Sequence, residues 1–558
     1  MNKLSAVAAA FCLCLISLAF ADPESPNPRA VPTFECLGLY YTLEAADDPG
    51  ECGVRYRTAG GGEWREVIPL FYNVKDSQFR GSIVGLVPDT EYEVELIHKG
   101  KTAKITARTM SEEFPVGKTT HLPDGTSDTQ LEITESGTPD GWHLVTVSPG
   151  GKHVIDPEKT RAHNIVIEGS YIIVRGLELR MAGQDAIYLK RGSHHIVIED
   201  CHIINWGRGD RRMAWLGWGD SAVRAAEGVG DLVIQRNLIE HPTGWTNDWD
   251  TGHPSGPQAI TVRNSSGHNI FRHNEIISTE DHGYNDAIGG GSNYSWEGAP
   301  NRDSDIYGNI VTNVWDDAIE AEGANMNVRI WGNYIDHVFT HIATATTSRG
   351  PLYIFRNVFG VSRRTQKNPT GGPMIKVGGD NREFRGGRRY VFHNTALQPH
   401  GAFRVFSTHQ LSDVISRNNL YDCPGVLTGI HDPIEPLDFQ YDMFTGIPNG
   451  KRWLKNRVGG GRPAFEPSQG LEWFPAVNTT RVKWGRTEVE HAGRTWRITD
   501  KVIRVPNPMI DSGEVLPGFN DNYAGAGPDI GAFERGRPPL KFGRRAGRKV
   551  ILAPWEVK

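Results

Sequence analysis

Asp317-Ala318-Ile319 repeats a motif that the chain has already used at Asp185-Ala186-Ile187 and Asp286-Ala287-Ile288. A second apolar series interleaves with it, as in Asp231-Leu232-Val233-Ile234 and Asp305-Ile306-Tyr307. Two strand types that alternate every few dozen residues are the sequence pattern of a parallel β-solenoid, so we predict an all-β fold. Because equivalent positions of successive coils stack about 4.8 Å apart, residues far apart in the chain are predicted to be neighbours.

The composition agrees with an extended, turn-rich β protein. The 558 residues are too many for one compact globule, and a solenoid avoids that limit by growing along one axis. The 64 glycines and 34 prolines suit frequent turns. Lys and Arg number 60 against 66 Asp and Glu, which gives a net charge of −6. A nucleic-acid partner, which requires a basic surface, is therefore not expected.

Residues 1–21 have the pattern of a secretory signal. Lys3 supplies the positive start, residues 6–20 the apolar run, and Ala19-Phe20-Ala21 a small-x-small cleavage site. A membrane anchor is the competing interpretation, but the run is short for a span and Asp22-Pro23 follows directly. We predict a protein that is secreted, extracellular or periplasmic, without a membrane span. The sequence does not indicate its oligomeric state.

Residues 30–112 are predicted to form a separate module of alternating strands. The run from Gly85 to Val94, Gly-Leu-Val-Pro-Asp-Thr-Glu-Tyr-Glu-Val, resembles the fibronectin type III pattern. That resemblance implies a small β-sandwich. We expect it to serve as a spacer or to cover the open end of the solenoid, where strand edges would otherwise be unpaired.

Residues 119–423 resemble the secreted right-handed parallel β-helix proteins, the superfold of pectin-degrading lyases and hydrolases. The resemblance consists of the strand pattern and of turns that contain asparagine, which tolerates left-handed backbone and can form a stacked ladder. These asparagines are Asn237, Asn274, Asn309, Asn333, Asn357 and Asn394. Residues 424–558 are predicted to pack back along the helix as a cap, and Pro528–Glu534 looks like the closing motif of such chains.

Aligning the coils on one buried position predicts the register. The predicted core residues are Ile187, Val223, Ile260, Ile288, Ile319, Ile342, Ile375 and Phe403. Because strand side chains alternate, the following residue should point outward. That outward column reads Tyr188, Arg224, Thr261, Gly289, Glu320, Ala343, Lys376 and Arg404, with Arg263 and Glu322 two positions further along.

Carboxylates crowd the centre of this surface. Asp286 is predicted to meet Asp317 on the next coil, with Asp316, Glu320 and Glu322 close by. Stacked carboxylates repel each other, so one of them should have a raised pKa unless a cation lies between them. A polymer-cleaving site has these features. The competing interpretation is that acidic ladders simply end the strands of the solenoid.

A resemblance to polygalacturonase-type hydrolases assigns roles to these residues. In that family one Asp precedes a core strand, an Asp pair precedes the next, and Ile-Lys follows two coils later; here these are Asp286, Asp316-Asp317 and Ile375-Lys376. The resemblance implies an acid and bases among the three aspartates, with inversion at the anomeric carbon. Lys376 would hold a substrate carboxylate or sulfate. The family's Gly-His-Gly and Arg are absent, since Thr340-His341 and Met374 occupy those places.

A polysaccharide lyase is the rival interpretation. Glu320-Ala321-Glu322 resembles the Glu-x-Glu calcium site of alginate and chondroitin lyases, and Ca²⁺ prefers such hard oxygen ligands. In such lyases the base is Lys or Arg. Position 327, where a Lys is expected, is Asn327, so Arg349, Arg356 or Lys376 would have to serve.

The remaining candidates border the same region. His282 enters the Asp286 coil and is the favoured catalytic histidine, while Arg302 and Arg349 are candidate substrate-binding cations together with Arg263. Indole side chains on glycine-rich insertions suit stacking on sugar rings, although packing within the loops is the alternative. The tryptophans in question are Trp206, Trp215, Trp218, Trp245, Trp249, Trp296 and Trp315.

Three hypotheses follow from the sequence. The first is a glycoside hydrolase that cleaves a polysaccharide in a groove on the β-helix, without a cofactor, by Asp286, Asp316 and Asp317. The second is a calcium-dependent lyase of an acidic glycan, with metal ligands Glu320 and Glu322. The third is a non-catalytic glycan-binding or adhesive solenoid. EDTA separates the second from the first.

Overall fold

The computed structural model describes most of the chain up to residue 444 and parts of the remainder. The predicted signal segment, Trp215 and Trp218 lie outside the described residues. The described residues are 27–44, 48–209, 219–290, 293–369, 371–378, 383–397, 401–405, 411–421, 427–428, 434–444, 481–482, 488–491, 494–497, 509–538 and 540–546. No helix among them is long and apolar enough to cross a membrane.

The N-terminal module consists of two four-stranded antiparallel sheets around one apolar cluster. Buried and partly exposed residues alternate along Cys52–Thr58, as expected for a strand with one face in a core. One sheet has the order β1 (Arg29–Pro32), β2 (Leu37–Thr42), β6 (Gln78–Ile83), β5 (Phe71–Asn73), and the other β4 (Arg65–Val67), β3 (Cys52–Thr58), β7 (Glu91–His98), β8 (Lys101–Arg108).

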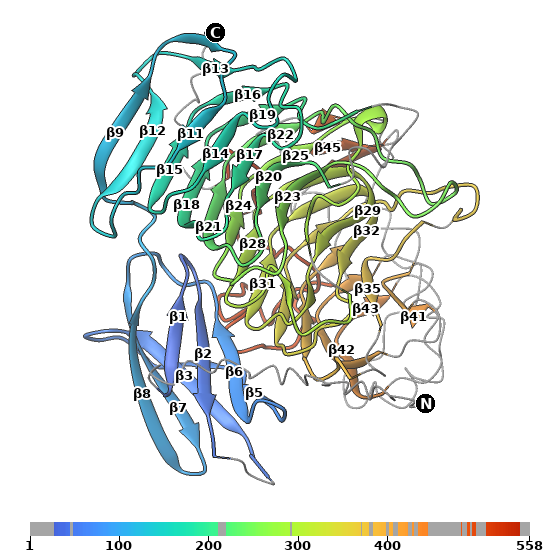
Figure 1. Cartoon of the computed structure of the whole chain (residues 1–558). Coiled ribbons are helices and arrows are strands. Elements are labelled where there is room, and N and C mark those ends of the chain that lie inside the picture. Colours follow the sequence, from blue (N-terminus) through green and yellow to red (C-terminus); the bar gives the residue numbers. More distant parts are fainter. Residues whose placement is uncertain are drawn as a thin grey trace, which may run out of the picture.

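The rest of the described chain is built on three ladders of parallel strands that form a right-handed parallel β-helix (Figure 1). The first ladder, which carries the candidate site, is β11 (Leu131–Ile133), β14 (Ile165–Ile167), β17 (Ile187–Leu189), β20 (Ser221–Ala225), β23 (Gln258–Val262), β26 (Ile288–Gly289), β29 (Ile310–Glu320), β32 (Tyr334–Ala343), β35 (Ile375–Val377), β38 (Phe403–Val405) and β41 (Leu427–Thr428).

The second ladder is a separate twelve-stranded sheet. Its strands are β9 (Val116–Leu122), β12 (Trp142–Val147), β15 (Ile172–Arg175), β18 (His194–Glu199), β21 (Gly230–Gln235), β24 (Ile270–Arg272), β28 (Asp305–Tyr307), β31 (Val328–Trp331), β33 (Leu352–Phe355), β36 (Arg389–Phe392), β39 (Ser412–Arg417) and β42 (Ile434–Gln440).

The third ladder shares the long strands β29 and β32 with the first, because these two strands run through both faces. Its other strands are β10 (Gly125–Ser127), β13 (His153–Ile155), β16 (Glu178–Arg180), β19 (His202–Ile204), β22 (Leu238–Glu240), β25 (Glu275–Ile277), β34 (Val358–Phe359), β37 (Thr395–Ala396), β40 (Leu420–Tyr421) and β43 (Met443–Phe444).

Short elements complete the list. The 3₁₀ turn η2 (Glu280–His282) precedes β26, and β27 (Gly298–Ala299) pairs with β30 (Glu322–Gly323). The strands β44 (Arg481–Val482), β45 (Glu488–His491) and β46 (Arg494–Arg497) form a small antiparallel sheet.

The predicted register of the first ladder is confirmed along its whole length. Ile187 pairs with Val223, and the pairing continues through the predicted core column to Phe403. These side chains belong to one continuous apolar cluster inside the helix. The outward column is therefore also in register, with Glu320 beside Ala343 and Ala343 beside Lys376.

The predicted asparagines form one buried ladder of side-chain amides. Each Nδ2 from Asn237 onward donates to the Oδ1 of the next asparagine, at 2.9 to 3.1 Å, and the series ends on Asn419 and Asp442. The asparagine itself does not adopt the left-handed conformation. The preceding residue does, for example Arg236 at φ 55° and His273 at φ 55°, because the asparagine amide is committed to the ladder.

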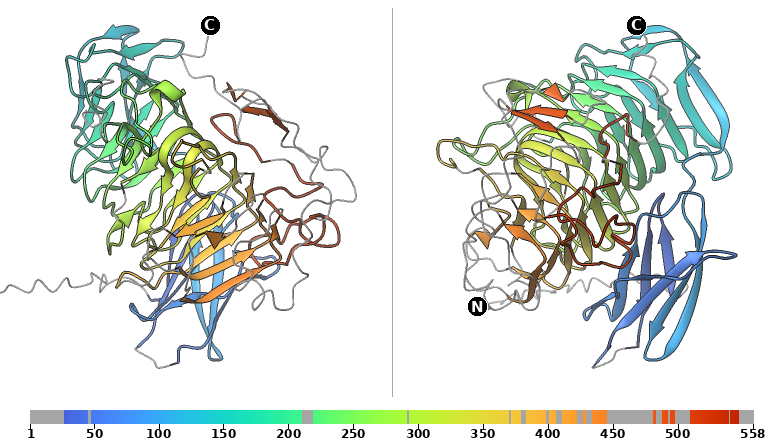
Figure 2. Two further views of the ribbon diagram at one scale, coloured as in Figure 1. Left: turned by 90° about the vertical axis from the view of Figure 1, so that its right-hand side faces the viewer. Right: turned by 180° about the vertical axis from the view of Figure 1, so that it is seen from behind.

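The boundaries differ from those predicted. Parallel pairing runs from Val116 to Phe444, beyond the predicted limits of 119 and 423. Two described stretches of the tail, residues 509–538 and 540–546, pack back on the helix: Gly531 N donates to the Asn418 carbonyl at 2.7 Å, and Arg544 lies 2.7 Å from Glu275. Figure 2 shows this segment, in red, along the later coils.

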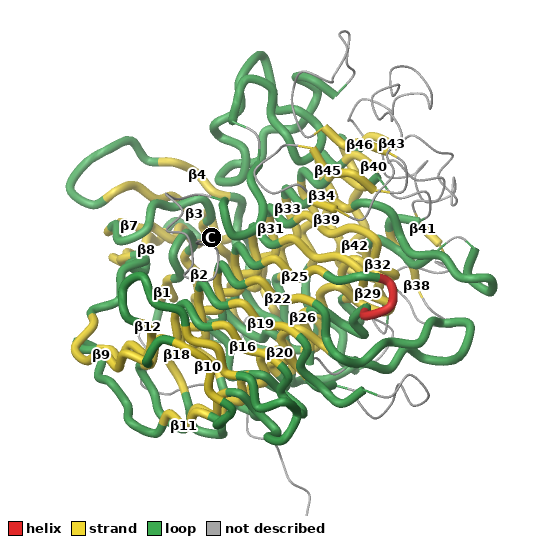
Figure 3. The backbone as a smooth tube through the Cα atoms, turned by 90° about the horizontal axis from the view of Figure 1, so that it is seen from above, coloured by secondary structure: helices red, strands yellow, loops and turns green. Residues whose placement is uncertain are grey.

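The N-terminal module lies along the second ladder. It does not cover the open end of the solenoid, which was one of the two roles expected from the sequence. Tyr40 donates to Asp303 at 2.8 Å, and Ser82 N donates to the Tyr353 hydroxyl at 3.1 Å. The buried Arg329 pairs with Asp305 at 2.5 Å beneath this contact. Polar and apolar contacts together hold the module on the flank of the helix, since Phe34 shares an apolar cluster with Trp142 and Val84 shares one with Tyr353. Figure 3 shows the strands of the module beside the coils.

Candidate active site

Three carboxylates of adjacent coils converge on the outer face of the first ladder. Asp286, Asp317 and Glu320 each present an oxygen atom, and these atoms lie within 4.8 Å of one another. Gly289 makes this approach possible, because a Cβ at this position would lie 2.4 Å from a Glu320 oxygen. The Gly290 N–H also donates to Glu320 Oε2 at 2.9 Å. The glycines thus let a carboxylate fold over the strand, where any side chain would block it.

Asp286 is held rigidly from three sides. Its Oδ2 accepts hydrogen bonds from Gln258 Nε2, at 2.8 Å, and from the Asn285 amide, while its Oδ1 accepts from the Asp317 N–H at 3.1 Å. Burial raises the pKa of Asp286 well above its usual value, and the charges of Glu320 and Asp317 raise it further.

A cation fits the donor set of this cluster. Asp317 is almost fully buried, and its Oδ1 has no hydrogen-bond partner in the part of the chain that the structure describes. A buried carboxylate oxygen that accepts no hydrogen bond destabilises the folded state, and three carboxylates around one point repel each other. A hard cation with oxygen ligands, such as Ca²⁺, satisfies both conditions.

Lys376 lies against the same cluster. Its Nζ is 2.5 Å from Asp317 Oδ2 and 3.2 Å from Glu322 Oε1. Burial alone would lower the pKa of Lys376, but the charges of Asp317 and Glu322 outweigh it and raise this pKa above the usual range. The lysine is therefore an ammonium as long as the carboxylates around it keep their full charge.

Glu322 does not stand beside Glu320 on the open surface. The strand β29 ends at Glu320, and the Glu322 side chain is fully buried, where its carboxylate accepts from Ala345 N at 3.2 Å and faces the Asn293 amide. Burial raises the pKa of Glu322 to about 8, although Lys376 acts in the opposite direction. The carboxylates that can share one ion are Asp286, Asp317 and Glu320, in place of the predicted pair Glu320 and Glu322.

Asp316 lies between the cluster and an insertion loop formed by residues 241–257. His253 of this loop, which the sequence analysis missed, places its Nε2 3.4 Å from Asp316 Oδ2. Burial raises the pKa of Asp316, and so do the charges of Asp317 and Asp286. His253 is 65% exposed, whereas the Asp316 side chain is only 8% exposed, so a ligand would meet the histidine first.

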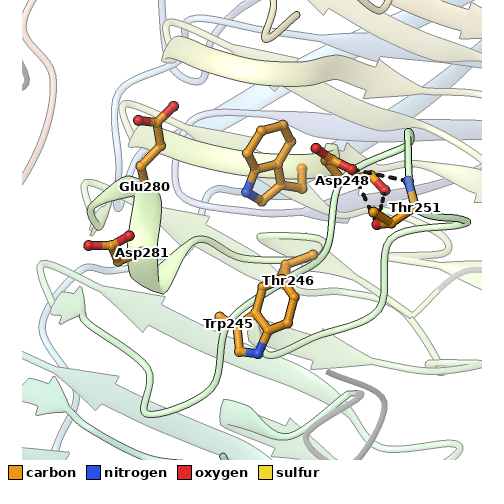
Figure 4. Close-up of a pocket in the computed structure, with 7 residues that line it drawn as sticks. Trp245, Thr246, Asp248, Thr251, Glu280 and Asp281 are labelled. Carbon is orange, nitrogen blue, oxygen red and sulfur yellow. Dashed lines mark hydrogen bonds between the residues drawn. The ribbon is translucent and has the colours of Figure 1, made fainter. Parts of the chain in front are cut away.

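A pocket of about 370 Å³ adjoins Asp316. Figure 4 shows Glu280 and Asp281 of η2 on one side and Asp248 and Thr251 of the 241–257 loop on the other. Trp245, Thr246 and Trp315 complete its lining. Arg363 stacks on Trp315, with its guanidinium carbon 3.7 Å from the ring centre, and pairs with Glu280 at 3.2 Å.

The other predicted site residues have separate surroundings. His282 Nδ1 bonds to the Pro242 carbonyl at 2.9 Å, and the His282 ring packs against His241. Arg263 is exposed and lies 3.7 Å from Glu227. Arg302 bonds to the Ser266 carbonyl at 3.1 Å near the start of β28.

Two further candidates contact the N-terminal module. Arg349 lies 3.4 Å from Asp76, and its carbonyl accepts from Asn73. The Lys75 ammonium lies 3.1 Å from the ring centre of Trp296. Trp206, predicted to lie on an open loop, is instead fully buried in the core.

Comparison with known proteins yields matches only among solved structures. No protein-family model and no curated protein matches the chain. One matching structure is the pectate lyase Pel9A, with 16% identity and a TM-score of 0.38, over 77% of this chain and 92% of that one. The fold is that of the right-handed parallel β-helix proteins.

Two further matches are also lyases. An alginate lyase from Paenibacillus sp. str. FPU-7 has 13% identity and a TM-score of 0.32, over 52% of this chain and 92% of that one. A mannuronic acid specific polysaccharide family 6 lyase from human gut microbiota has 14% identity and a TM-score of 0.32, over 60% of this chain and 76% of that one. The strand pairing of this β-helix defines its fold, independently of these values.

Proposed function

We propose that this β-helix is an exported carbohydrate-active enzyme, a polysaccharide lyase that cleaves an acidic glycan with the help of Ca²⁺. One observation carries the proposal: Asp286, Asp317 and Glu320 place oxygen atoms within 4.8 Å of one another, and Lys376 Nζ lies 2.5 Å from Asp317. A cation site and an amine at its edge are the two groups that β-elimination from a uronate requires.

Asp286, Asp317 and Glu320 would hold the ion. When bound, Ca²⁺ would neutralise the uronate carboxylate and so acidify the hydrogen on the adjacent carbon, C5. The ion would also offset the charges of Asp317 and Glu320, two of the four carboxylates that raise the pKa of Lys376. The lowering effect of burial on this pKa would then be opposed less, which favours the neutral amine that a base requires.

Lys376 would take the C5 proton. The electron pair left on C5 forms a double bond to C4, the C4–O4 bond breaks, and the departing oxygen takes a proton from water. The product carries a 4,5-unsaturated uronate at its new non-reducing end. Buried Glu322 would act as a positioning residue, because its carboxylate lies 3.2 Å from Lys376 Nζ and orients that amine.

A glycoside hydrolase is the second candidate, favoured by one observation. Asp316 has a raised pKa, as a general acid should, and lies 3.4 Å from the exposed His253. Inverting hydrolases, however, separate their two carboxyl groups by about 6.5–9.5 Å, to admit a water. Asp286 and Asp317 have oxygen atoms within 4.8 Å, which suits a shared cation better than a separated pair.

The test is a digest of acidic and neutral polysaccharides, in Ca²⁺ and in EDTA. Absorbance near 235 nm and new reducing ends would be followed together. We expect both signals from an acidic glycan, with loss of both in EDTA and in Lys376→Ala. Reducing ends without the absorbance would support the hydrolase, and retention of glycan without cleavage would support the non-catalytic binding solenoid.

A further inference from the structure

The pocket between η2 and the 241–257 loop lies next to the carboxylate cluster. Trp315, which lines the pocket, directly precedes Asp316 on β29, and His253 of the loop reaches Asp316 at 3.4 Å. A glycan chain with one ring at the cluster would therefore place a neighbouring ring in this pocket. The volume of about 370 Å³ lies within the about 300–1,000 Å³ that small-ligand pockets offer.

The wall of the pocket that is formed by the 241–257 loop is fixed in place. Asp250 accepts hydrogen bonds from the backbone N–H groups of Gln366 and Lys367, at 2.6 and 2.8 Å. Trp249 packs against Phe339 of β32, with ring centres 5.5 Å apart. The loop is therefore anchored to the next coils, and the pocket that it lines is built in advance of binding.

The charge of the pocket is negative. Asp248, Glu280 and Asp281 line it, and the buried Arg363 balances one of them through its pair with Glu280. Within the described residues, Asp281 forms no ion pair, and Asp248 accepts from the N–H groups of Asp250 and Thr251. An anionic ring in this pocket would meet like charge, which costs affinity.

We propose that this pocket holds a sugar ring without carboxylate or sulfate, a neutral hexose or an N-acetylhexosamine, next to the uronate at the cluster. The inference rests on the proposed function and names its substrate class: an acidic heteroglycan in which uronates alternate with neutral rings. Trp245 and Trp315 line the pocket, Arg363 covers one face of Trp315, and indole rings suit packing against the C–H surface of such a ring. The carboxylates accept hydrogen bonds from its hydroxyl or amide N–H groups.

The test compares two classes of polymer under the same conditions, by absorbance near 235 nm. Polygalacturonate and alginate represent uronate homopolymers, and unsulfated chondroitin, hyaluronan and the rhamnogalacturonan backbone represent alternating chains. We expect a kcat/KM at least about tenfold higher for one of the alternating chains. Equal or faster cleavage of a homopolymer overturns this inference and leaves the proposed function intact. Absence of the 235 nm product from every polymer overturns the proposed function, and the inference with it.

A charge reversal in the pocket sharpens the test. Asp281→Lys should reduce the preference for the alternating chain at least about fivefold, by raising its KM and lowering that of the homopolymer. Asp140→Lys is the matched control, because Asp140 is an exposed carboxylate on a turn of the first coils. It should leave the preference unchanged. An equal effect of the two variants would mean that overall charge, rather than the pocket, selects the polymer, and would overturn the inference.

Discussion

Lys376 Nζ lies 2.5 Å from Asp317 Oδ2, although the two residues belong to strands that are separated by a whole coil. Ala343 occupies the intervening position, beside both Glu320 and Lys376. Because alanine has no side chain beyond Cβ, the lysine can extend across β32 to the carboxylates. A larger residue at 343 would separate the amine from the cluster.

Replacement of Lys376 tests the proposed base. Lys376→Ala should lower kcat by about 10²–10⁴-fold with little change in KM, as expected for loss of a proton acceptor. Steady-state kinetics at 235 nm measure this. Lys190→Ala is the control, since Lys190 is a partly exposed lysine of an earlier coil that pairs with Glu168 at 2.6 Å. Full activity of the Lys376 variant would exclude it as the base.

Removal of one carboxylate tests the cation site. Ligand binding to the folded state raises the melting temperature, so Ca²⁺ should raise the Tm of the wild type. Glu320→Gln should reduce this shift by at least half, while Glu227→Gln, which changes an exposed carboxylate three coils away, should not. Differential scanning calorimetry with Ca²⁺ or EDTA gives the answer. The same Ca²⁺ shift in Glu320→Gln would argue against this ligand set.

The buried carboxylates predict a pH dependence of stability. The pKa of Glu322 is raised from 4.5 to about 8, so the folded state binds more protons than the unfolded state between these values. Stability should therefore fall as the pH rises from about 4.5 to about 8 in EDTA, and each pKa unit corresponds to about 1.4 kcal/mol. Urea denaturation at several pH values measures the slope. Glu322→Gln should flatten it, and an unchanged slope would mean that other groups control it.

Substitution of an asparagine of the ladder should cause a large loss of folding stability. Asn333→Ala would remove the acceptor of Asn309 and the donor to Asn357, at about 1–3 kcal/mol for each buried group left without a partner. Chemical denaturation should show a lower midpoint. Asn247→Ala, in the 241–257 loop, removes an asparagine outside the ladder and should shift the midpoint much less. Equal shifts would show that the ladder adds nothing beyond ordinary turn contacts.

Periodic features of the fold could be read from the sequence, and irregular ones could not. The column from Ile187 to Phe403 has one apolar residue per coil, and strand pairing preserves that register. The alternation rule failed after Glu320, because the strand ends there and Glu322 turns inward. Burial of Glu322 depends on contacts with Lys376 and Ala345, which no spacing in the sequence specifies.

Site residues on loops also could not be predicted from the sequence. His253 reaches Asp316 from an insertion whose path depends on Asp250 and the backbone of Lys367. No repeat constrains that path, so only the aromatic content of the insertion hinted that it borders the site. The carboxylates themselves were found because they lie on the repeating strands.

The C-terminal tail affects how the stack of coils unfolds. A stack of coils in which each contacts only its neighbours can fray from its last coil inward. Here Arg544 binds Glu275 of β25, and Gly531 binds Asn418 just before β40, so one segment joins coils that are far apart in the stack. Release of the coil that contains Asn418 therefore also breaks its contact with a segment that is tied to a middle coil. This strap should therefore slow the unfolding that begins at the C-terminal coils.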